Sequence, residues 1–232
     1  MGSLPPLHRV RLPWKIFSSA MPARTRQHSR DKQMRILIAQ EAARLIAIDG
    51  IRDFGAAKRK AAERLGAPDT HNLPRNVEVE AELVAYQTLF MGQDQPRELQ
   101  RLRRAALDAM QFFSQFEPRL TGSLVNGTAG RHSDVNIHLF APTPEEVVLK
   151  LIEAGIPFED LQRRFRLNRD LSETLPAMRF LADDVTVEIV VFPLNGLRQS
   201  PLSSVDGRPM ERVSISRLEA MLEQGAQTGG SG

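Results

Sequence analysis

The hydrophobic pattern changes at Pro118, and no other feature of this 232-residue sequence constrains the fold as strongly. Before Pro118, apolar residues recur every three or four positions, which is the period of a helix with one buried face. After it, apolar residues alternate in steps of two, as Val135, Ile137 and Leu139 do, and this period is typical of a strand. The sequence therefore predicts an α+β fold in which a helical region precedes a small mixed sheet.

Capping residues set the expected bounds of these elements. Asp53 and Asn76 are expected as N-caps because their short side chains can accept a hydrogen bond from the first turn, and Gly66 is expected just past a helix end. The expected helices cover residues 31–48, 54–65, 77–90, 96–116, 144–154 and 216–223. The expected strands cover residues 119–125, 133–140, 158–167, 178–181 and 185–192.

The charges also divide the chain. Residues 1–35 hold eight Lys or Arg and a single acid, Asp31, whereas the remainder holds 23 basic and 27 acidic residues and is mildly acidic. We expect a disordered basic leader over 1–30, a helical region over 31–116, an α+β domain over 117–224 and a disordered tail over 225–232. Met21 is a second candidate for the natural start, so the sequence leaves open whether residues 1–20 belong to the natural protein.

Several classes of protein are excluded by what the sequence lacks. Without cysteine there is no disulfide, thiolate metal site or cysteine nucleophile. No stretch approaches the roughly 20 apolar residues that span a bilayer, and the N-terminus has no long apolar signal region. The P-loop, dinucleotide-binding, serine-hydrolase and zinc-protease motifs are absent. We therefore expect a cytoplasmic protein without membrane insertion.

One stretch, LTGSLVNGTAGRHSDVNIHLF at residues 120–140, carries polar side chains in an ordered pattern. A Gly122-Ser123 turn follows an apolar run, and a loop of small residues leads to the next strand. Asp134, Asn136 and His138 then alternate with apolar residues, so all three lie on one face of that strand. A solvated face of an edge strand gives the same pattern, and these residues alone leave that alternative open.

The order of these elements resembles that of the polymerase-β-like nucleotidyltransferase superfamily. In that superfamily a Gly-Ser or Gly-Gly turn is followed, after a short loop, by an Asp-x-Asp/Glu pair on a strand, and a third carboxylate comes from a later strand. Gly122-Ser123, Asp134 and Glu188 match this order within residues 118–195. Asn136 stands where the second carboxylate is expected, so the resemblance is to a degenerate member.

The resemblance implies a nucleotide site with a divalent metal. Asp134, Asn136 and Glu188 would hold Mg²⁺ or Mn²⁺. Asp134 and Glu188 would be the catalytic pair, with Glu188 as a metal ligand or as the base that takes the acceptor's proton. Gly122 lets the backbone approach a nucleoside triphosphate, and the Ser123 hydroxyl can bond a phosphate oxygen. An amide at position 136 brings no charge, so it weakens the field at the metal.

Two basic segments are candidates for contacts with phosphate groups. On the strand expected over 158–167, Arg164 and Arg166 share one face and can hold a triphosphate or an RNA backbone; otherwise they protect an exposed edge. The segment over 56–66 is expected to be a basic helix, and its candidates for nucleic-acid binding are Lys58, Arg59, Lys60 and Arg64. These four are otherwise a solvated helix face.

Three functions stay open on the sequence. The first is a transferase that moves a nucleoside monophosphate from an NTP, with a divalent metal, to an acceptor that the sequence does not identify: RNA, DNA, a protein or a small molecule. The second is a catalytically degenerate relative that binds nucleotide or nucleic acid as a regulator or interaction module, and Asn136 favours it. The third is a helical interaction protein whose sheet half is only structural. Nucleotide binding that depends on Ser123 would contradict the third.

Overall fold

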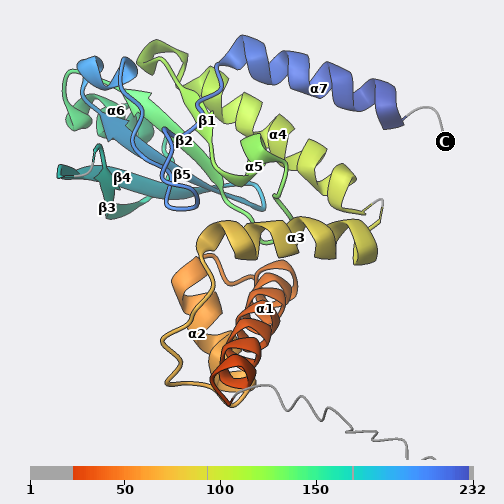
Figure 1. Ribbon diagram of the computed structural model, residues 1–232. Coiled ribbons are helices and arrows are strands. Elements are labelled where there is room, and N and C mark those ends of the chain that lie inside the picture. Colours follow the sequence, from red (N-terminus) through yellow and green to blue (C-terminus); the bar gives the residue numbers. More distant parts are fainter. Residues whose placement is uncertain (1–22, 93, 169, 230–232) are drawn as a thin grey trace, which may run out of the picture.

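A computed structural model describes residues 23–92, 94–168 and 170–229 (Figure 1). In these residues the predicted α+β fold is confirmed, because a helical part comes first and a five-stranded mixed sheet follows. The helices are α1 (Ala23–Asp49), α2 (Phe54–Arg64), α3 (Asn76–Phe90), α4 (Asp94–Phe112), α5 (Ser123–Asn126), α6 (Pro144–Glu153) and α7 (Ile215–Gly229). The strands are β1 (Arg119–Thr121), β2 (Val135–Phe140), β3 (Glu159–Arg166), β4 (Ser172–Ala182) and β5 (Val185–Phe192).

Helices α1, α2 and α3 form a small bundle with a core of its own, in the lower part of Figure 1. Alanines on α1 and α2 let the helix backbones approach closely, and larger side chains fill the remaining space. The buried residues of this core include Ile38, Ala42, Leu45, Ala57, Ala61, Val79 and Leu83. The predicted N-cap of α2 is confirmed, since the Asp53 carboxylate accepts a hydrogen bond from the Ala56 amide at 2.6 Å.

The predicted N-cap of α3 is wrong. Arg75 takes the N-cap position, and the Glu78 carboxylate reaches back to accept a hydrogen bond from its backbone N–H at 2.8 Å. Asn76 instead links two parts of the chain: its amide oxygen accepts from Lys58, and its nitrogen donates to the backbone of Ser204. The side chain is engaged in tertiary contacts that the sequence pattern does not report.

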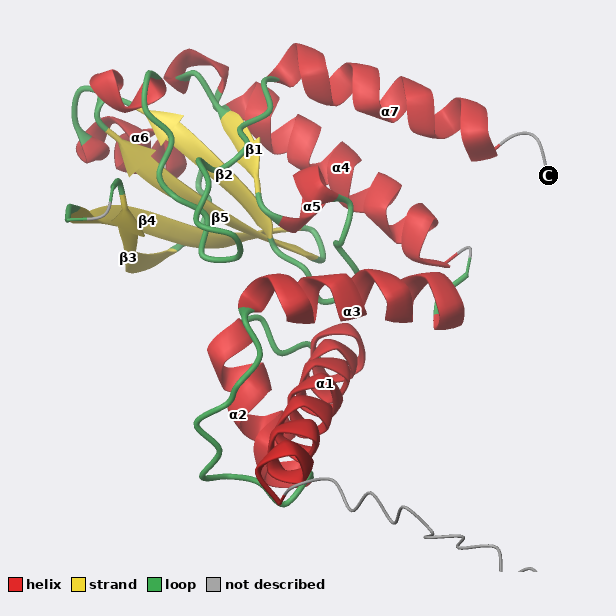
Figure 2. Cartoon of the chain, viewed as in Figure 1, coloured by secondary structure: helices red, strands yellow, loops and turns green. Residues whose placement is uncertain are grey.

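The sheet has the strand order β1-β2-β5-β4-β3 (Figure 2). Strands β2 and β5 are parallel neighbours at its centre, and all other pairings are antiparallel. Because β2 and β5 run side by side in the same direction, residues that lie 52 positions apart along the chain, such as Asn136 and Glu188, become direct neighbours. This pairing brings the two halves of the candidate site together.

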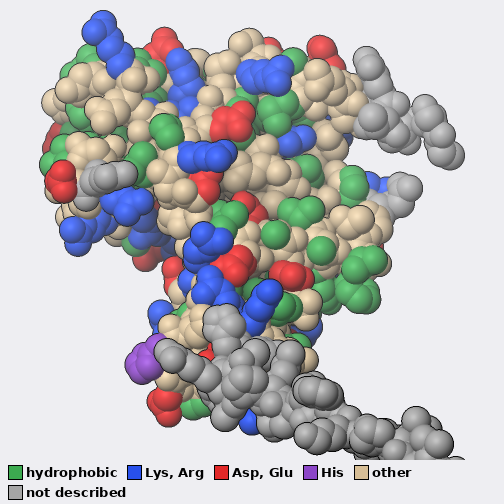
Figure 3. Space-filling model, viewed as in Figure 1, with side chains coloured by type: hydrophobic (Ala, Val, Ile, Leu, Met, Phe, Trp, Pro, Cys, Tyr) green, Lys and Arg blue, Asp and Glu red, His purple; other side chains and the backbone are tan. Residues whose placement is uncertain are grey.

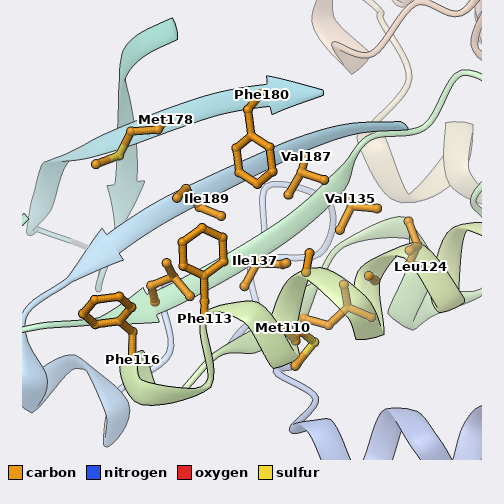
Figure 4. Packing of buried hydrophobic residues seen from close by; sticks show 14 of the residues in the cluster. Met110, Phe113, Phe116, Leu124, Val135, Ile137, Met178, Phe180, Val187 and Ile189 are labelled. Atoms are coloured by element: carbon orange, nitrogen blue, oxygen red, sulfur yellow. The ribbon is translucent and has the colours of Figure 1, made fainter. Parts of the chain in front are cut away.

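One face of the sheet forms the main core of the protein, against α4 and α6. Figure 4 shows Met110 and Phe113 packed on Val135, Ile137, Val187 and Ile189 of the two central strands. Helix α7 packs along α4, and its Leu218 is buried in the same core. The main core therefore includes α4, whereas α1–α3 belong to a separate core.

The opposite face of the sheet is only partly covered. A small cluster of Phe140, Leu175, Ala177, Val190 and Phe192 is buried at one end of this face. Asn136, Arg179 and Glu188 lie at the other end, toward the helical bundle. This uncovered end is where the candidate site lies.

Two predicted strands have wrong bounds. The strand expected over 119–125 ends at Thr121, because Gly122 adopts a positive φ of 76° and turns the chain into α5. The strand expected over 178–181 begins earlier, at Ser172, and pairs with β3 from Ser172 to Arg179. Pro176 lies inside β4 and is tolerated there because it precedes the part of β4 that pairs with β5.

The ends of the chain extend beyond the expected helices. Helix α1 already begins at Ala23, inside the predicted leader over 1–30, and residues 1–22 lie outside the described part. Helix α7 continues through Gly229, into the segment expected as a disordered tail, and residues 230–232 are not described. The helices that the structure describes are too short or too polar to cross a bilayer.

Candidate functional site

A cleft of about 990 Å³ lies between the helical bundle and the uncovered end of the sheet. Its walls come from the α1–α2 loop, from α3, from the loop around Gly122, from β2, β3 and β5, and from residues 202–211. In Figure 3, basic and acidic side chains gather where the bundle meets the sheet. All seven residues predicted for the nucleotide and metal site line this cleft: Gly122, Ser123, Asp134, Asn136, Arg164, Arg166 and Glu188.

Asp134, Asn136 and Glu188 are brought together by the register of β2 and β5. Asn136 and Glu188 are direct partners across the two strands, and Asp134 immediately precedes β2, two positions before Asn136 on the same face. The Asn136 amide nitrogen donates to the backbone carbonyl of Asp134 at 3.2 Å. The amide is therefore turned toward the start of its own strand.

The Gly122-Ser123 turn lies against this face. Gly122 has φ 76° and ψ −148°, which a side chain disfavours, and a Cβ atom there would lie 3.7 Å from the Asn136 amide nitrogen. The turn is held from behind by Arg103 of α4, whose guanidinium donates two hydrogen bonds to the Leu124 carbonyl, at 3.0 and 2.9 Å. Arg103 is buried, which lowers its pKa, and the two bonds satisfy part of its guanidinium there.

The Asp134 carboxylate is paired with an arginine from the helical bundle. Its Oδ2 lies 2.5 Å from Nη1 of Arg52, in the loop between α1 and α2. The Asp134 side chain is 10% exposed and the Arg52 side chain 52% exposed. Burial raises the pKa of Asp134, and the positive charges of Arg52 and Arg179 offset only part of that rise. The arginine thus neutralises a carboxylate that is mostly withdrawn from water.

The Glu188 carboxylate is held by two arginines. Arg163 donates from Nε and Nη2 to its two oxygens, both at 2.6 Å, and Arg179 donates from Nη2 at 2.9 Å. The Glu188 side chain is only 9% exposed. Burial alone would raise its pKa, but the hydrogen bonds from Arg163 and Arg179 outweigh burial and lower it. Glu188 is therefore a fixed, ionised carboxylate.

These residues do not fit a two-metal centre. Mg²⁺ prefers oxygen ligands, and the site offers two carboxylates and one amide. Both carboxylates already have guanidinium partners, and a divalent ion would have to displace three arginine side chains. Among the described residues there is no group of three or more His, Asp or Glu side chains that could hold a metal ion.

Arg164 and Arg166 lie beside this arrangement. They alternate with Arg163 along β3, so their Cβ atoms are on the other face of the sheet from Glu188. Both side chains are exposed and still line the cleft, and the backbone carbonyl of Arg166 accepts from the amide of Leu202. Their proposed contact with phosphate stays a prediction.

The basic residues of α2 lie away from this face of the sheet. Lys58 donates to the Pro74 carbonyl and to the Asn76 side chain, and Arg64 pairs with Glu41 and Asp49. Lys60 lies 3.9 Å from Asp49. The structure records no such partner for Arg59 within the part of the chain that it describes. Three of the four candidates are thus used inside the bundle, and their role toward nucleic acid stays a prediction.

His138 shares the face of Asn136 and lies at the wall of the cleft, but its side chain is almost wholly buried. Its side chain is 2% exposed and contacts the rings of Phe165 and Phe192. Nδ1 accepts a hydrogen bond from Nε of Arg212 at 3.1 Å, so the imidazole is neutral. Burial, and secondly the charge of Arg212, lower the pKa of His138 to about 3. His138 is therefore a packing residue of the uncovered face.

Gly122 offers a direct test of the turn. We expect Gly122→Ala to lower the free energy of unfolding by about 1–3 kcal/mol, because a side chain is forced into a backbone conformation that almost only glycine adopts. Gly130→Ala is the matched control, since the new Cβ would meet only the Gln87 amide at 3.8 Å. Urea denaturation measures both; equal losses would contradict a special backbone requirement at Gly122.

Comparison with known proteins gives a partial likeness. No protein-family model and no curated protein sequence matches the chain. Among solved structures, Cid1 poly(U) polymerase is similar at 22% identity and a TM-score of 0.30, over 40% of this chain and 30% of that one. Cid1 with its short product ApU is similar at 24% identity and a TM-score of 0.30, over 43% of this chain and 32% of that one. Cid1 with bound MgGTP is similar at 20% identity and a TM-score of 0.28, over 40% of this chain and 32% of that one.

These matches are too limited to carry an argument. The chain covers less than a third of the length of each solved structure, and the superposition is loose.

Proposed function

We propose that the cleft is the nucleotide site of a nucleotidyltransferase-like protein that binds a nucleoside triphosphate without turning it over and acts as a regulator or interaction module. The observation that carries this proposal is the convergence of the Gly122-Ser123 turn with Asp134, Asn136 and Glu188 on one side of one cleft. These residues come from three separate segments, so neither local sequence nor the packing of a single element accounts for their meeting.

The chemistry of the cleft suits a phosphorylated ligand. Gly122 has no side chain to keep a phosphate from the backbone, and the Ser123 hydroxyl can donate to a phosphate oxygen. Arginines line the same cleft, and their planar guanidinium groups match the geometry of phosphate oxygens. The cleft volume of about 990 Å³ is enough for a nucleotide.

Three features favour binding over catalysis. Asn136 brings no charge to the position between the two acids. Glu188 has a lowered pKa and three hydrogen bonds from arginines, so it is a poor base for an acceptor hydroxyl near neutral pH. Asp134 is paired with Arg52. A transfer reaction needs at least one of these carboxylates to be released.

Arg52 favours a second candidate function, the transfer of a nucleoside monophosphate to RNA, DNA or protein. It lies in a loop and is half exposed, so of the three arginines it is the one whose side chain can leave most easily. In that case Asp134 would hold the metal, which supplies charge neutralisation at the triphosphate, and Glu188 would orient or deprotonate the acceptor. This candidate predicts turnover that depends on Asp134.

Equilibrium binding of fluorescent ATP, GTP, CTP and UTP tests the proposal. We expect at least one nucleotide to bind, and we expect Ser123→Ala to weaken its binding by about tenfold, the effect of one lost hydrogen bond to a charged group. Ser114→Ala is the matched control, because Ser114 is exposed and lies outside the cleft. Absence of binding by all four nucleotides would refute both candidate functions.

Turnover separates the two candidates. The protein is incubated with each labelled NTP, Mg²⁺ or Mn²⁺, and a mixture of RNA, DNA and protein, with Asp134→Ala as the control. Binding without label transfer or pyrophosphate release supports the regulator. Label transfer that disappears in Asp134→Ala supports the transferase and overturns the regulator. Asn136→Asp tests whether residue 136 occupies the position of the missing second carboxylate. If it does, the new carboxylate should raise the affinity of the site for metal.

A further inference from the structure

Three guanidinium groups contact the carboxylates of Asp134 and Glu188 in the cleft. Arg52, Arg163 and Arg179 bring three positive charges against the negative charges of Asp134, Glu188 and Glu159, the last an exposed side chain that lies 3.5 Å from Arg179. Arg164 and Arg166 also line the cleft, and the described residues offer neither of them an acidic partner. The part of the cleft around the acids therefore carries a net positive charge.

A divalent cation is expected to bind only weakly beside Asp134 and Glu188. It would have to displace the bidentate bond of Arg163, and the bond of Arg179, from Glu188, whose side chain is only 9% exposed. It would then lie beside three guanidinium groups, and charges of the same sign repel strongly where water is scarce. The carboxylates are thus used as partners of arginine.

The guanidinium groups of the cleft can donate hydrogen bonds to an anion. The Nε atom of Arg179 is buried, and no described residue accepts a hydrogen bond from it. A buried donor without a partner is unfavourable, and a phosphate oxygen would satisfy it. The side chains of Arg52 and Arg163 are 52% and 35% exposed, so both can turn toward a ligand in the cleft.

We propose that the cleft binds the triphosphate of its nucleotide through Arg52, Arg163 and Arg179, in the place where a nucleotidyltransferase would use divalent metal ions. This inference rests on the proposed nucleotide-binding function and specifies the form of the ligand: a triphosphate free of metal. The arginines neutralise the phosphate charge, and Asp134 and Glu188 keep them in position while the cleft is empty. Both acids then compete with the ligand for the same guanidinium groups.

The competition predicts an unusual sign for one substitution. Glu188→Gln removes a negative charge and releases Arg163 and Arg179, so it should tighten triphosphate binding by about tenfold, the effect of one charge-assisted hydrogen bond. A metal-dependent site predicts the reverse, because losing a ligand weakens metal and nucleotide together. Asp134→Asn releases Arg52 in the same way and serves if Glu188→Gln does not fold. Arg179→Gln should weaken binding, and Arg217→Gln, on exposed α7 surface, is the matched charge control.

The experiment is a titration of the full chain with ATP, GTP, CTP, UTP and inorganic tripolyphosphate, in EDTA and again in excess Mg²⁺. We expect binding in EDTA to be at least as tight as in Mg²⁺, because Mg²⁺ sequesters the phosphates. Thermal unfolding confirms that each variant is folded.

Binding that requires Mg²⁺ and weakens in Glu188→Gln or Asp134→Asn would overturn the inference while leaving nucleotide binding intact. Absence of binding in both conditions would overturn the inference and the proposed function together. Binding in EDTA that Arg179→Gln leaves unchanged would also overturn it, because the arginine set would then not be the ligand.

Discussion

Replacing Phe113 by alanine should lower the free energy of unfolding by about 3–5 kcal/mol, the largest effect that we expect from a single substitution in this chain. Phe113 is fully buried just after α4, and its ring lies 6.0 Å from that of Phe180, centroid to centroid. In Figure 4 the ring points at Ile137 and Ile189 in the middle of the sheet. Truncation removes the ring that packs beside Met110 on the two central strands and leaves a cavity.

Urea denaturation followed by far-UV circular dichroism measures this loss. Phe90→Ala is the matched control: Phe90 is 71% exposed and contacts the ring of Tyr86, so its replacement should have an effect of no more than about 1 kcal/mol. A loss at position 113 as small as that at position 90 would mean that α4 is not part of the main core.

Hydrogen exchange locates the loss within the molecule. Because α1–α3 have a core of their own, Phe113→Ala should speed exchange in β2 and β5 and leave α1 protected. The sequence placed a domain boundary at 116, after α4, because α4 continues the helical pattern of the first half. Periodicity reveals which face of a helix is buried but not which partner covers it, so this boundary is a question for the exchange experiment.

The arginine partner of Glu188 could be predicted in part from the sequence. Strands β4 and β5 form a hairpin, and the pairing of Ala182 with Val185 sets Arg179 opposite Glu188. A lone arginine between apolar residues of a strand, opposite a lone glutamate, is the signal of an ion pair. The run of arginines that includes Arg164 and Arg166 is a stronger local signal than the single Arg179, so the sequence prediction names the former and not the latter.

Arg52 and Arg212 give no such signal. Arg52 lies in the loop between α1 and α2, and Arg212 lies in the irregular segment after β5, so neither follows a strand or helix period. Their positions against Asp134 and His138 depend on how the bundle and that segment fold back onto the sheet. Such contacts are tertiary, and a pattern within one element does not report them.

The turn into α5 shows a different limit. Leu124 and Val125 are apolar residues after a short strand, so the pattern predicts that the strand continues. The positive φ of Gly122 ends it, and Leu124 is then buried from a helix. Glycine signals a break, but whether a strand or a helix follows depends on packing, here on the Arg103 bonds to the Leu124 carbonyl.

Alternation placed His138 on the correct face but not in the correct environment. The residues that bury it come from the edge strand β3 and from the end of β5, where Phe165 and Phe192 enclose the imidazole. A polar residue in an alternating pattern is expected to face water unless something covers that face. The covering elements lie more than 20 residues further along the chain, beyond the range of a local pattern.

The burial of His138 should make the protein less stable in mild acid. Its pKa in the folded protein is lowered to about 3, by burial first and then by the charge of Arg212, whereas in the unfolded chain it is near the ordinary value of 6.5. The unfolded state therefore binds the proton more readily. The stabilisation is complete above about pH 6.5 and is lost as the pH falls toward 3, and about 2 kcal/mol of it should disappear between pH 7 and pH 5.

Between pH 7 and pH 5, His138 changes its protonation on unfolding, whereas the acidic residues with strongly lowered pKa values do not. Glu41 and Glu78 have pKa values lowered to about 2, mainly by hydrogen bonds from Arg44 and Arg35, and their contribution is lost only below about pH 4.5. His138→Gln keeps an acceptor for Arg212 without a titrating ring. Urea denaturation of this variant should show about 2 kcal/mol less loss between pH 7 and pH 5 than the wild-type chain.

His71→Gln is the control, because His71 is an exposed histidine in the loop between α2 and α3. The same pH dependence in the wild-type chain and in His138→Gln would mean that folding does not lower the pKa of His138. The cluster of Phe165, Phe192 and Arg212 around the imidazole would then have to open far enough for His138 to be charged in the folded state. That opening would expose the uncovered face of the sheet next to the cleft, and binding of triphosphate should then change over the same pH range.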